Sequence, residues 1–130
     1  MRMLLDTHLL LLALGEPGRL DRGTRDLIAD TGNEVLFSAA SIWEIAIKTA
    51  LGRFDFKVAP EAIVDGARRT GFTGLPVRPA AAALVASLPP LHRDPFDRLL
   101  VAQAMTEPAR LYTADPMLPP YSELVSLVAS

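Results

Sequence analysis

The sequence predicts an α/β domain built around a mainly parallel β-sheet, and three observations carry this prediction. Short apolar runs typical of buried strands alternate along the chain with segments of helical periodicity, which is the pattern of parallel strands joined by helical crossovers. The chain has 130 residues, half of them hydrophobic, so it can bury a core of the size that one domain requires. Most of the 11 prolines stand at the boundaries of these segments, where proline starts or stops helices.

Five segments are predicted to be strands, because each is a short apolar run bounded by turn or charged residues. In chain order they are residues 2–5, 34–38, 75–77, 110–113 and 124–128. Since parallel strands need crossover connections, we expect the helices between them to cross with the right-handed sense that such connections take.

Six segments have helical spacing of their apolar residues, and several carry start or stop signals. In chain order they are residues 9–14, 21–31, 41–51, 60–71, 80–87 and 95–106. Pro60 and Pro95 stand at first helical positions, Asp94 is the predicted N-cap before Pro95, and Gly52 is a C-terminal stop.

The composition excludes several classes of protein. The chain has no cysteine, which rules out a disulfide framework, a thiolate zinc site and a cysteine nucleophile. Its net charge is −2, so contact with nucleic acid must depend on a local patch or on a bridging metal ion. Asp6 and His8 interrupt the apolar N-terminal run, no small-residue cleavage site follows, and no stretch is long enough to span a bilayer. We therefore expect a cytoplasmic protein without membrane contact, forming a single domain over residues 1–130.

Four acidic residues stand where the predicted elements end or begin. Asp6 closes the first strand, Glu44 and Asp97 lie in the predicted first turns of their helices, and Asp115 follows the strand at residues 110–113. Because the carboxyl ends of parallel strands share one edge of a sheet, we expect Asp6, Glu44 and Asp115 to meet there, and Asp97 to join them if its helix begins there.

Such a carboxylate cluster is unfavourable when empty, because like charges repel one another. It becomes favourable around a hard divalent cation such as Mg²⁺ or Mn²⁺, which prefers oxygen ligands. A metal ion of this kind activates water and stabilises charge on phosphate oxygens. The pattern therefore favours phosphodiester hydrolysis.

Each acidic residue also has a purely structural interpretation. Ser41 and Glu44 form the S-x-x-E pattern of a capping box, Asp97 would complement a helix dipole, and Asp115 precedes a proline and would start a turn. Asp6 is harder to explain in this way, because an acidic residue directly after a buried strand is costly unless it is satisfied. The functional interpretation depends on the four occurring together.

Other side chains are weaker candidates. His8 and His92 carry no motif spacing, and His92 is expected to be a loop residue. Trp43 is interpreted as a core or interface residue rather than a platform for bases. Candidates for substrate contact, or for hydrogen bonds that tune the site, are Thr7, Arg93, Arg98 and Thr113.

Four motifs together resemble the PIN-domain ribonucleases, most closely the VapC-type toxins of type II toxin–antitoxin systems. They are LLDTH at residues 4–8, FSAASIWEIAIK at residues 37–48, HRDPFDRLLVAQA at residues 92–104 and LYTAD at residues 111–115. They stand in the family's order and span nearly the whole chain, whereas the segment 54–90 carries little recognisable motif.

The resemblance implies a fold, a reaction and partners. The fold is a three-layer α/β/α sandwich around a parallel sheet. The four principal acidic residues of the family fall on Asp6, Glu44, Asp97 and Asp115, and Asp94 matches an accessory acidic residue. Family members bind Mg²⁺ or Mn²⁺, cleave RNA, usually form homodimers and are inhibited by a cognate antitoxin protein.

The resulting mechanistic hypothesis assigns a role to each carboxylate. Asp6, Asp97 and Asp115 hold one or two divalent ions, and Glu44 completes the cluster and orients the attacking water. Two other interpretations compete with it. A phosphoacceptor receiver-like domain requires paired acidic residues after the first strand and a late lysine, but no lysine follows Lys57. A non-catalytic acidic binding module would use the same edge only to dock a basic partner.

Overall fold

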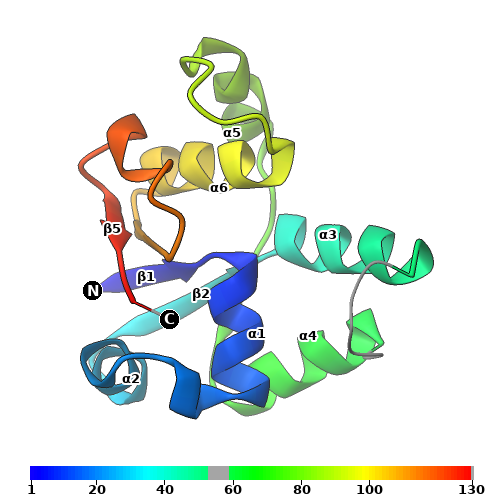
Figure 1. The fold of residues 1–130 in the computed structure, drawn as a ribbon, viewed down its shortest axis with the longest axis vertical. Coiled ribbons are helices and arrows are strands. Elements are labelled where there is room, and N and C mark those ends of the chain that lie inside the picture. Colours follow the sequence, from blue (N-terminus) through cyan, green and yellow to red (C-terminus); the bar gives the residue numbers. More distant parts are fainter. Residues whose placement is uncertain (53–58, 130) are drawn as a thin grey trace.

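A single parallel sheet organises the protein, as the computed structural model shows for residues 1–52 and 59–129 (Figure 1). The strand order is β3-β2-β1-β4-β5, and every neighbouring pair runs parallel. The strands are β1 (Arg2–Leu5), β2 (Glu34–Ser38), β3 (Thr73–Leu75), β4 (Arg110–Thr113) and β5 (Val125–Leu127).

Helices connect the strands and cover both faces of the sheet. The α-helices are α1 (Thr7–Gly15), α2 (Arg22–Ala29), α3 (Ala39–Ala50), α4 (Pro60–Arg69), α5 (Pro79–Leu84) and α6 (Pro95–Thr106). Short 3₁₀ turns are η1 (Pro17–Arg19), η2 (Val85–Ser87) and η3 (Pro119–Tyr121). No helix in the described ranges is long and apolar enough to cross a membrane.

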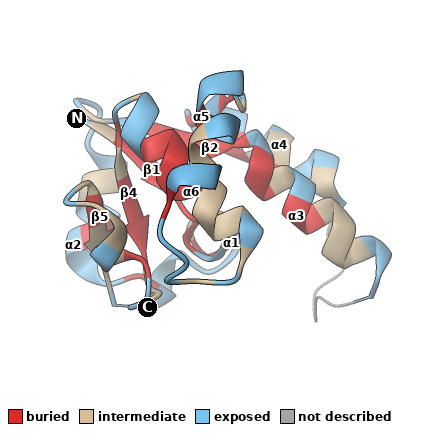
Figure 2. Ribbon diagram, turned by 90° about the horizontal axis from the view of Figure 1, so that it is seen from above, coloured by how far each residue is buried: buried red, intermediate tan, exposed pale blue. Residues whose placement is uncertain are grey.

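Two hydrophobic cores lie on opposite faces of the sheet, and alternate residues of β1 enter each. Leu4 belongs to the core beneath α5 and α6, whereas Met3 and Leu5 belong to the core beneath α1 and α4. This alternation is the period-2 geometry of a strand buried on both faces, and in Figure 2 β1 and β4 are buried between exposed helical surfaces. The architecture is therefore the predicted α/β/α sandwich, and the predicted fold class is confirmed.

The first helix differs from its prediction in extent. It begins at Thr7, two residues before the predicted start, because Asp6 caps it: Asp6 Oδ1 accepts from the Leu9 amide at 2.8 Å. Its leucines pack into the core. Leu9 and Leu10 are fully buried, and Leu11 packs against the same core.

Other boundaries differ by a few residues. The strand predicted at residues 75–77 is observed at Thr73–Leu75, and the helix predicted at residues 21–31 ends at Ala29. Gly74 is paired with Phe37 of β2 in the sheet. The bounds of β3 are therefore set by its pairing with β2 and not by the apolar run at residues 75–77. Of the segment 54–90, residues 54–58 lie outside the described residues, and the remainder forms α4, β3, α5 and η2.

The order of the strands creates one topological switch point, between β1 and β4. From β1 the chain adds β2 and β3 on one side of the sheet, and it then returns to add β4 and β5 on the other. The crossovers on either side of such a point diverge and leave a crevice at the carboxyl ends of the strands, where ligands of open α/β sheets bind. Asp6 follows β1 and Asp115 follows β4 at this crevice.

A buried polar contact ties α6 to the sheet close to this edge. Ser38, the last residue of β2, donates to Gln103 Oε1, and Gln103 Nε2 donates to the Pro76 carbonyl at 3.3 Å. Both side chains are buried, so these hydrogen bonds replace the contacts with water that the polar groups lose on folding. The pair fixes how α6, which carries Asp97, lies against β2.

We predict that Gln103→Leu destabilises the fold by about 1–3 kcal/mol, because the buried Ser38 hydroxyl loses the acceptor of its proton and the Pro76 carbonyl loses the Gln103 donor. The melting temperature should fall by about 3 °C or more in thermal unfolding followed by circular dichroism. Met105→Leu, at an exposed position of the same helix, is the control and should change stability by less than about 0.5 kcal/mol. An unchanged melting temperature for Gln103→Leu would contradict this account of the contact.

Candidate functional site

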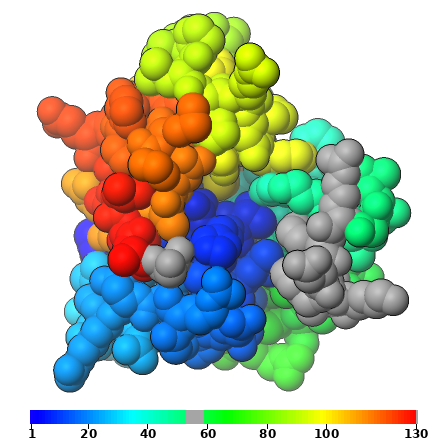
Figure 3. Space-filling view, viewed as in Figure 1, coloured from blue at the N-terminus to red at the C-terminus, as the bar shows by residue number. Residues whose placement is uncertain are grey.

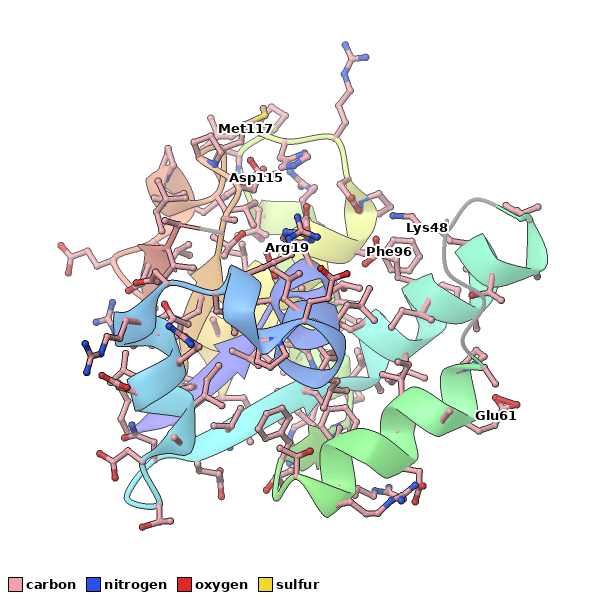
Figure 4. The ribbon with its side chains drawn as sticks, turned by 60° about the horizontal axis from the view of Figure 1, so that its bottom comes forward. Arg19, Lys48, Glu61, Phe96, Asp115 and Met117 are labelled. Carbon is pink, nitrogen blue, oxygen red and sulfur yellow. The ribbon has the colours of Figure 1, made fainter. Side chains whose placement is uncertain are left out.

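A cleft of about 420 Å³ opens at the switch point, and all four acidic residues singled out from the sequence line it. We call it the acidic cleft. Its lining residues are Asp6, Thr7, His8, Glu44, Asp94, Asp97, Ala114 and Asp115. In Figure 3 the N-terminal segment, in blue, lies recessed between the C-terminal segments and α6. Asp115, Phe96 and Lys48, labelled in Figure 4, come from three of the segments around it: the loop after β4, the start of α6, and α3.

Asp6 is held in place on both carboxylate oxygens. Oδ1 accepts from the Leu9 amide at 2.8 Å, and Oδ2 accepts from the Thr113 hydroxyl at 2.6 Å. The side chain is only 6% exposed, and these two donors offset part of its desolvation. The first strand therefore ends in a carboxylate whose position is set by α1 on one side and by β4 on the other.

Glu44 is buried on the cleft side of α3 and does not take part in a capping box. The N-cap of α3 is Ser38, whose hydroxyl accepts from the Ala40 amide at 2.9 Å, so Glu44 lies in the second turn. The predicted Ser41 cap is wrong because the strand residue Ser38 starts the helix three positions earlier. Glu44 Oε1 instead accepts from the Thr7 hydroxyl at 2.6 Å, and its other oxygen accepts from Lys48.

Asp97 lies in the first turn of α6, as predicted, behind the N-cap Asp94. Asp94 Oδ1 accepts from the amides of Phe96 and Asp97 at 2.9 and 3.4 Å, which confirms the predicted cap. Since this end of the helix opens at the cleft, Asp97 joins the carboxylates that follow the strands.

Asp115 combines the predicted turn with a place in the cleft. Its Oδ1 accepts from the Met117 amide at 2.9 Å, which is an Asx turn. Its Oδ2 lies 2.7 Å from His92 Nε2, and the same nitrogen lies 3.4 Å from Asp97 Oδ2. A loop histidine thus contacts one acidic residue of the cleft and lies close to a second.

Burial and mutual repulsion perturb the titration of two of these carboxyls. Desolvation, together with the smaller effects of the nearby charges of Asp94, Asp6 and Glu44, raises the pKa of Asp97 to about 7, and His92 has a smaller opposing effect. Desolvation also raises the pKa of Asp6, whereas its hydrogen bonds from Thr113 and Leu9 act in the opposite direction. At neutral pH the cleft therefore holds more negative charge than its surroundings stabilise.

The remaining candidates fall into two groups. Thr7 and Thr113 are buried and donate hydrogen bonds to Glu44 and Asp6, as the tuning role requires. Arg93 is exposed beside His92. Arg98 is engaged elsewhere: its guanidinium donates to the carbonyls of the loop after α5 and to the Tyr121 hydroxyl.

Two residues have surroundings that the sequence did not indicate. His92 contacts Asp115, although no motif spacing marks it. The two residues are 23 positions apart, so the contact forms only when the loop after β4 packs beside the loop that carries His92. Trp43 is 61% exposed on α3 and meets Phe96 edge-on at a ring-centroid distance of 5.4 Å. It is therefore not a core residue of this chain.

The donor set of the cleft fits a hard divalent cation. Five carboxylates line it, and within the described residues His92, Asp97 and Asp115 bring possible ligand atoms to within 4.8 Å of one another. Oxygen-rich sites of this kind suit Mg²⁺ and Mn²⁺. Bound metal would also offset the excess negative charge that raises the pKa values of Asp97 and Asp6.

Fold and cleft together define a sandwich domain with a carboxylate-lined crevice. The PIN domain family model matches residues 3–123, so the chain belongs to the PIN domain family, whose members are typically nucleases.

The fold is also similar to that of a solved structure, described as VapBC2 from Rickettsia felis bound to a DNA fragment from their promoter. The TM-score is 0.73 at 16% sequence identity, over 98% of this chain and 99% of the other. No curated protein sequence matches this chain. The resemblance to VapBC2 is therefore one of fold.

We predict that, in a chelator, the protein loses stability as pH rises from 5 to 8. Asp97 has a pKa of about 7 in the folded state, above its value of 3.8 in an unfolded chain. A raised folded-state pKa contributes stability that is complete below the unfolded value and disappears as pH rises through the folded value. The loss should be on the order of 1–3 kcal/mol, or several degrees in melting temperature.

Asp97→Asn isolates this contribution, because asparagine does not ionise. Its melting temperature should exceed that of the wild type by an amount that grows from pH 5 to pH 8. Asp26→Asn, an exposed substitution on α2 with the same change in charge, should run parallel to the wild type. Parallel curves for all three proteins would mean that Asp97 titrates normally.

Proposed function

We propose that this protein is a Mg²⁺- or Mn²⁺-dependent endoribonuclease that acts as the toxin of a toxin–antitoxin pair. The observation that carries the proposal is the convergence of Asp6, Glu44, Asp97 and Asp115 in one cleft. Membership of a family of nucleases supports a hydrolytic reaction at phosphodiester bonds. A lining rich in carboxylates supports metal-assisted attack by water, since the cleft offers no serine or cysteine nucleophile among its lining residues.

Each carboxylate has a distinct environment from which a role follows. Asp6, Asp97 and Asp115, at the end of β1, the start of α6 and the end of β4, would hold the metal. The bound ion would lower the pKa of water and stabilise the charge that develops on the phosphate.

Glu44, on α3, lines the same cleft, accepts hydrogen bonds from Thr7 and Lys48, and would orient the attacking water. Thr113 keeps Asp6 in place from the neighbouring strand. Arg93, which is exposed and follows His92 in the chain, would contact the RNA backbone.

The toxin assignment is supported by the sequence motifs and by the fold. The motifs resemble VapC-type toxins, and one structure of similar fold is VapBC2 from Rickettsia felis bound to a DNA fragment from their promoter. By analogy we propose a cognate antitoxin protein as partner, a homodimer as the assembled form, and the cytoplasm, where RNA is cleaved, as the location.

Metal binding should stabilise the folded protein measurably. We predict that millimolar Mg²⁺ raises the melting temperature at pH 7.5, since ligand at 100 times its dissociation constant contributes about 2.7 kcal/mol. Asp97→Asn should lose most of this increase, because it removes both a ligand and part of the repulsion that the metal relieves. Asp26→Asn is the matched control and should keep the increase. Equal melting curves with metal and with chelator would exclude the proposed metal centre.

RNA cleavage is the direct test of the function. We predict that Asp6→Asn lowers the rate of cleavage by more than about 100-fold, while the circular dichroism spectrum stays unchanged. A loss of this size exceeds what is expected when a residue that only hydrogen-bonds to a metal ligand is removed. Purified wild-type protein should cleave a single-stranded RNA with Mg²⁺ and not with chelator, and Asp26→Asn should match the wild type. Cleavage by Asp6→Asn at the wild-type rate would overturn the mechanism.

The same variant tests the biological role. Brief induction in a bacterial host should arrest growth for the wild type and not for Asp6→Asn, and mapping of cleavage sites in total RNA would identify the target. A protein that binds basic partners but never cleaves RNA would instead be the non-catalytic binding module.

A further inference from the structure

We propose that His92 is a positioning residue of the acidic cleft: its Nε2–H donates a hydrogen bond to Asp115, and the ring is not a ligand of the metal. The inference rests on the proposed function for the presence of a metal, but its structural part concerns the protein alone. It decides between two roles that the same three side chains would allow.

The imidazole lies in a position that either role requires. Its Nε2 is 2.7 Å from Asp115 Oδ2 and 3.4 Å from Asp97 Oδ2. These three side chains present possible ligand atoms within 4.8 Å of one another, as two carboxylates and a histidine do around a transition metal. Proximity alone therefore does not distinguish a ligand from a hydrogen-bond donor.

The other ring nitrogen distinguishes them. His92 Nδ1 accepts from the backbone amide of Asp94 at 3.1 Å. An amide N–H only donates, so Nδ1 must present its lone pair, and the ring proton is assigned to Nε2. A ligating nitrogen needs a free lone pair, and ligating histidines donate their second N–H to an acceptor. His92 has the opposite arrangement, with its N–H facing the carboxylates.

The loop that carries His92 is held firmly enough to keep this arrangement. The His92 amide donates to the Tyr121 hydroxyl at 2.8 Å, and that hydroxyl also accepts from Arg98 at 3.1 Å. Arg98 in turn donates to the carbonyls of Val85, Leu88 and Pro89. Arg98, a predicted substrate contact, thus helps to hold Tyr121, and Tyr121 holds the backbone of His92.

The consequence falls on Asp115. With His92 on Oδ2 and the Met117 amide on Oδ1, both of its oxygens have a donor, and the carboxylate keeps one orientation toward the cleft. The donor also lies between Asp115 and Asp97, where it lowers the repulsion between them. His92 would thereby orient Asp115 for a metal that is bound through oxygen atoms alone.

Metal affinity tests the positioning role without any cleavage. By Mn²⁺ titration calorimetry, His92→Leu, which has no donor, should bind Mn²⁺ at least about 10-fold more weakly than the wild type, as expected when a partner of a ligand is lost. His92→Gln, which retains an N–H of similar reach, should recover most of the affinity. Equal affinity for His92→Leu and wild type, absence of binding in both included, would overturn the proposal.

If His92→Leu fails to fold, Tyr121→Phe provides the same test, because it removes the acceptor that holds the His92 amide. It should weaken Mn²⁺ binding severalfold, and unchanged affinity would overturn the proposal.

Nuclear magnetic resonance separates donor from ligand directly. The chain has two histidines, so His8→Gln assigns the imidazole signals of His92. Long-range ¹H–¹⁵N correlation spectra should show His92 as the Nε2–H form both before and after saturation with Mg²⁺. A change to the Nδ1–H form on addition of metal would make His92 a ligand and overturn the proposal. The two proposals can fail separately. If the protein cleaves no RNA, the proposed function is overturned. If His92 nevertheless has its proton on Nε2 and His92→Leu weakens metal binding, the inference about His92 stands.

Discussion

Carboxylates that repel one another are gathered at one edge of a parallel sheet, and the rest of the fold serves to keep them there. Burial raises the pKa values of Asp6 and Asp97, so the arrangement is costly at neutral pH. The cost is offset locally by hydrogen bonds from Leu9 and Thr113 to Asp6, and globally by two apolar cores that clamp the sheet from both faces. A strained polar site on a well-packed scaffold is a common property of functional clefts.

The same few contacts serve both structure and site. Asp6 is at once the N-cap of α1 and a cleft carboxylate, and Asp94 caps the helix that presents Asp97. Ser38 caps α3 and binds Gln103, which connects the helix of Glu44 with the helix of Asp97. Because each contact joins two elements of the cleft, its geometry is part of the fold rather than an addition to it.

The sequence predicted the fold class, all five strands and the four acidic residues of the cleft, because each depends on local periodicity or on a strand end. Its errors have a common cause. Ser41 matched a capping pattern, but the true cap, Ser38, is the last residue of a strand, and this depends on the pairing of β2 in the sheet. The hydrogen-bond partners of His92 and Arg98 were not predicted, because Asp115 and Tyr121 are distant in sequence and reach them only through the packing of the C-terminal segment.

The position of the switch point also determines when the cleft comes into being during synthesis. Thr113, which binds Asp6, leaves the ribosome more than 100 residues after Asp6, and it does so on the strand that pairs with β1; Asp115 follows that strand. Pairing over such a separation closes a long loop and occurs late. A nascent chain that has not yet placed β4 beside β1 lacks Asp115 in its cleft and lacks the hydrogen bond from Thr113 to Asp6. The cleft is therefore complete only after β4 has been synthesised and has paired with β1.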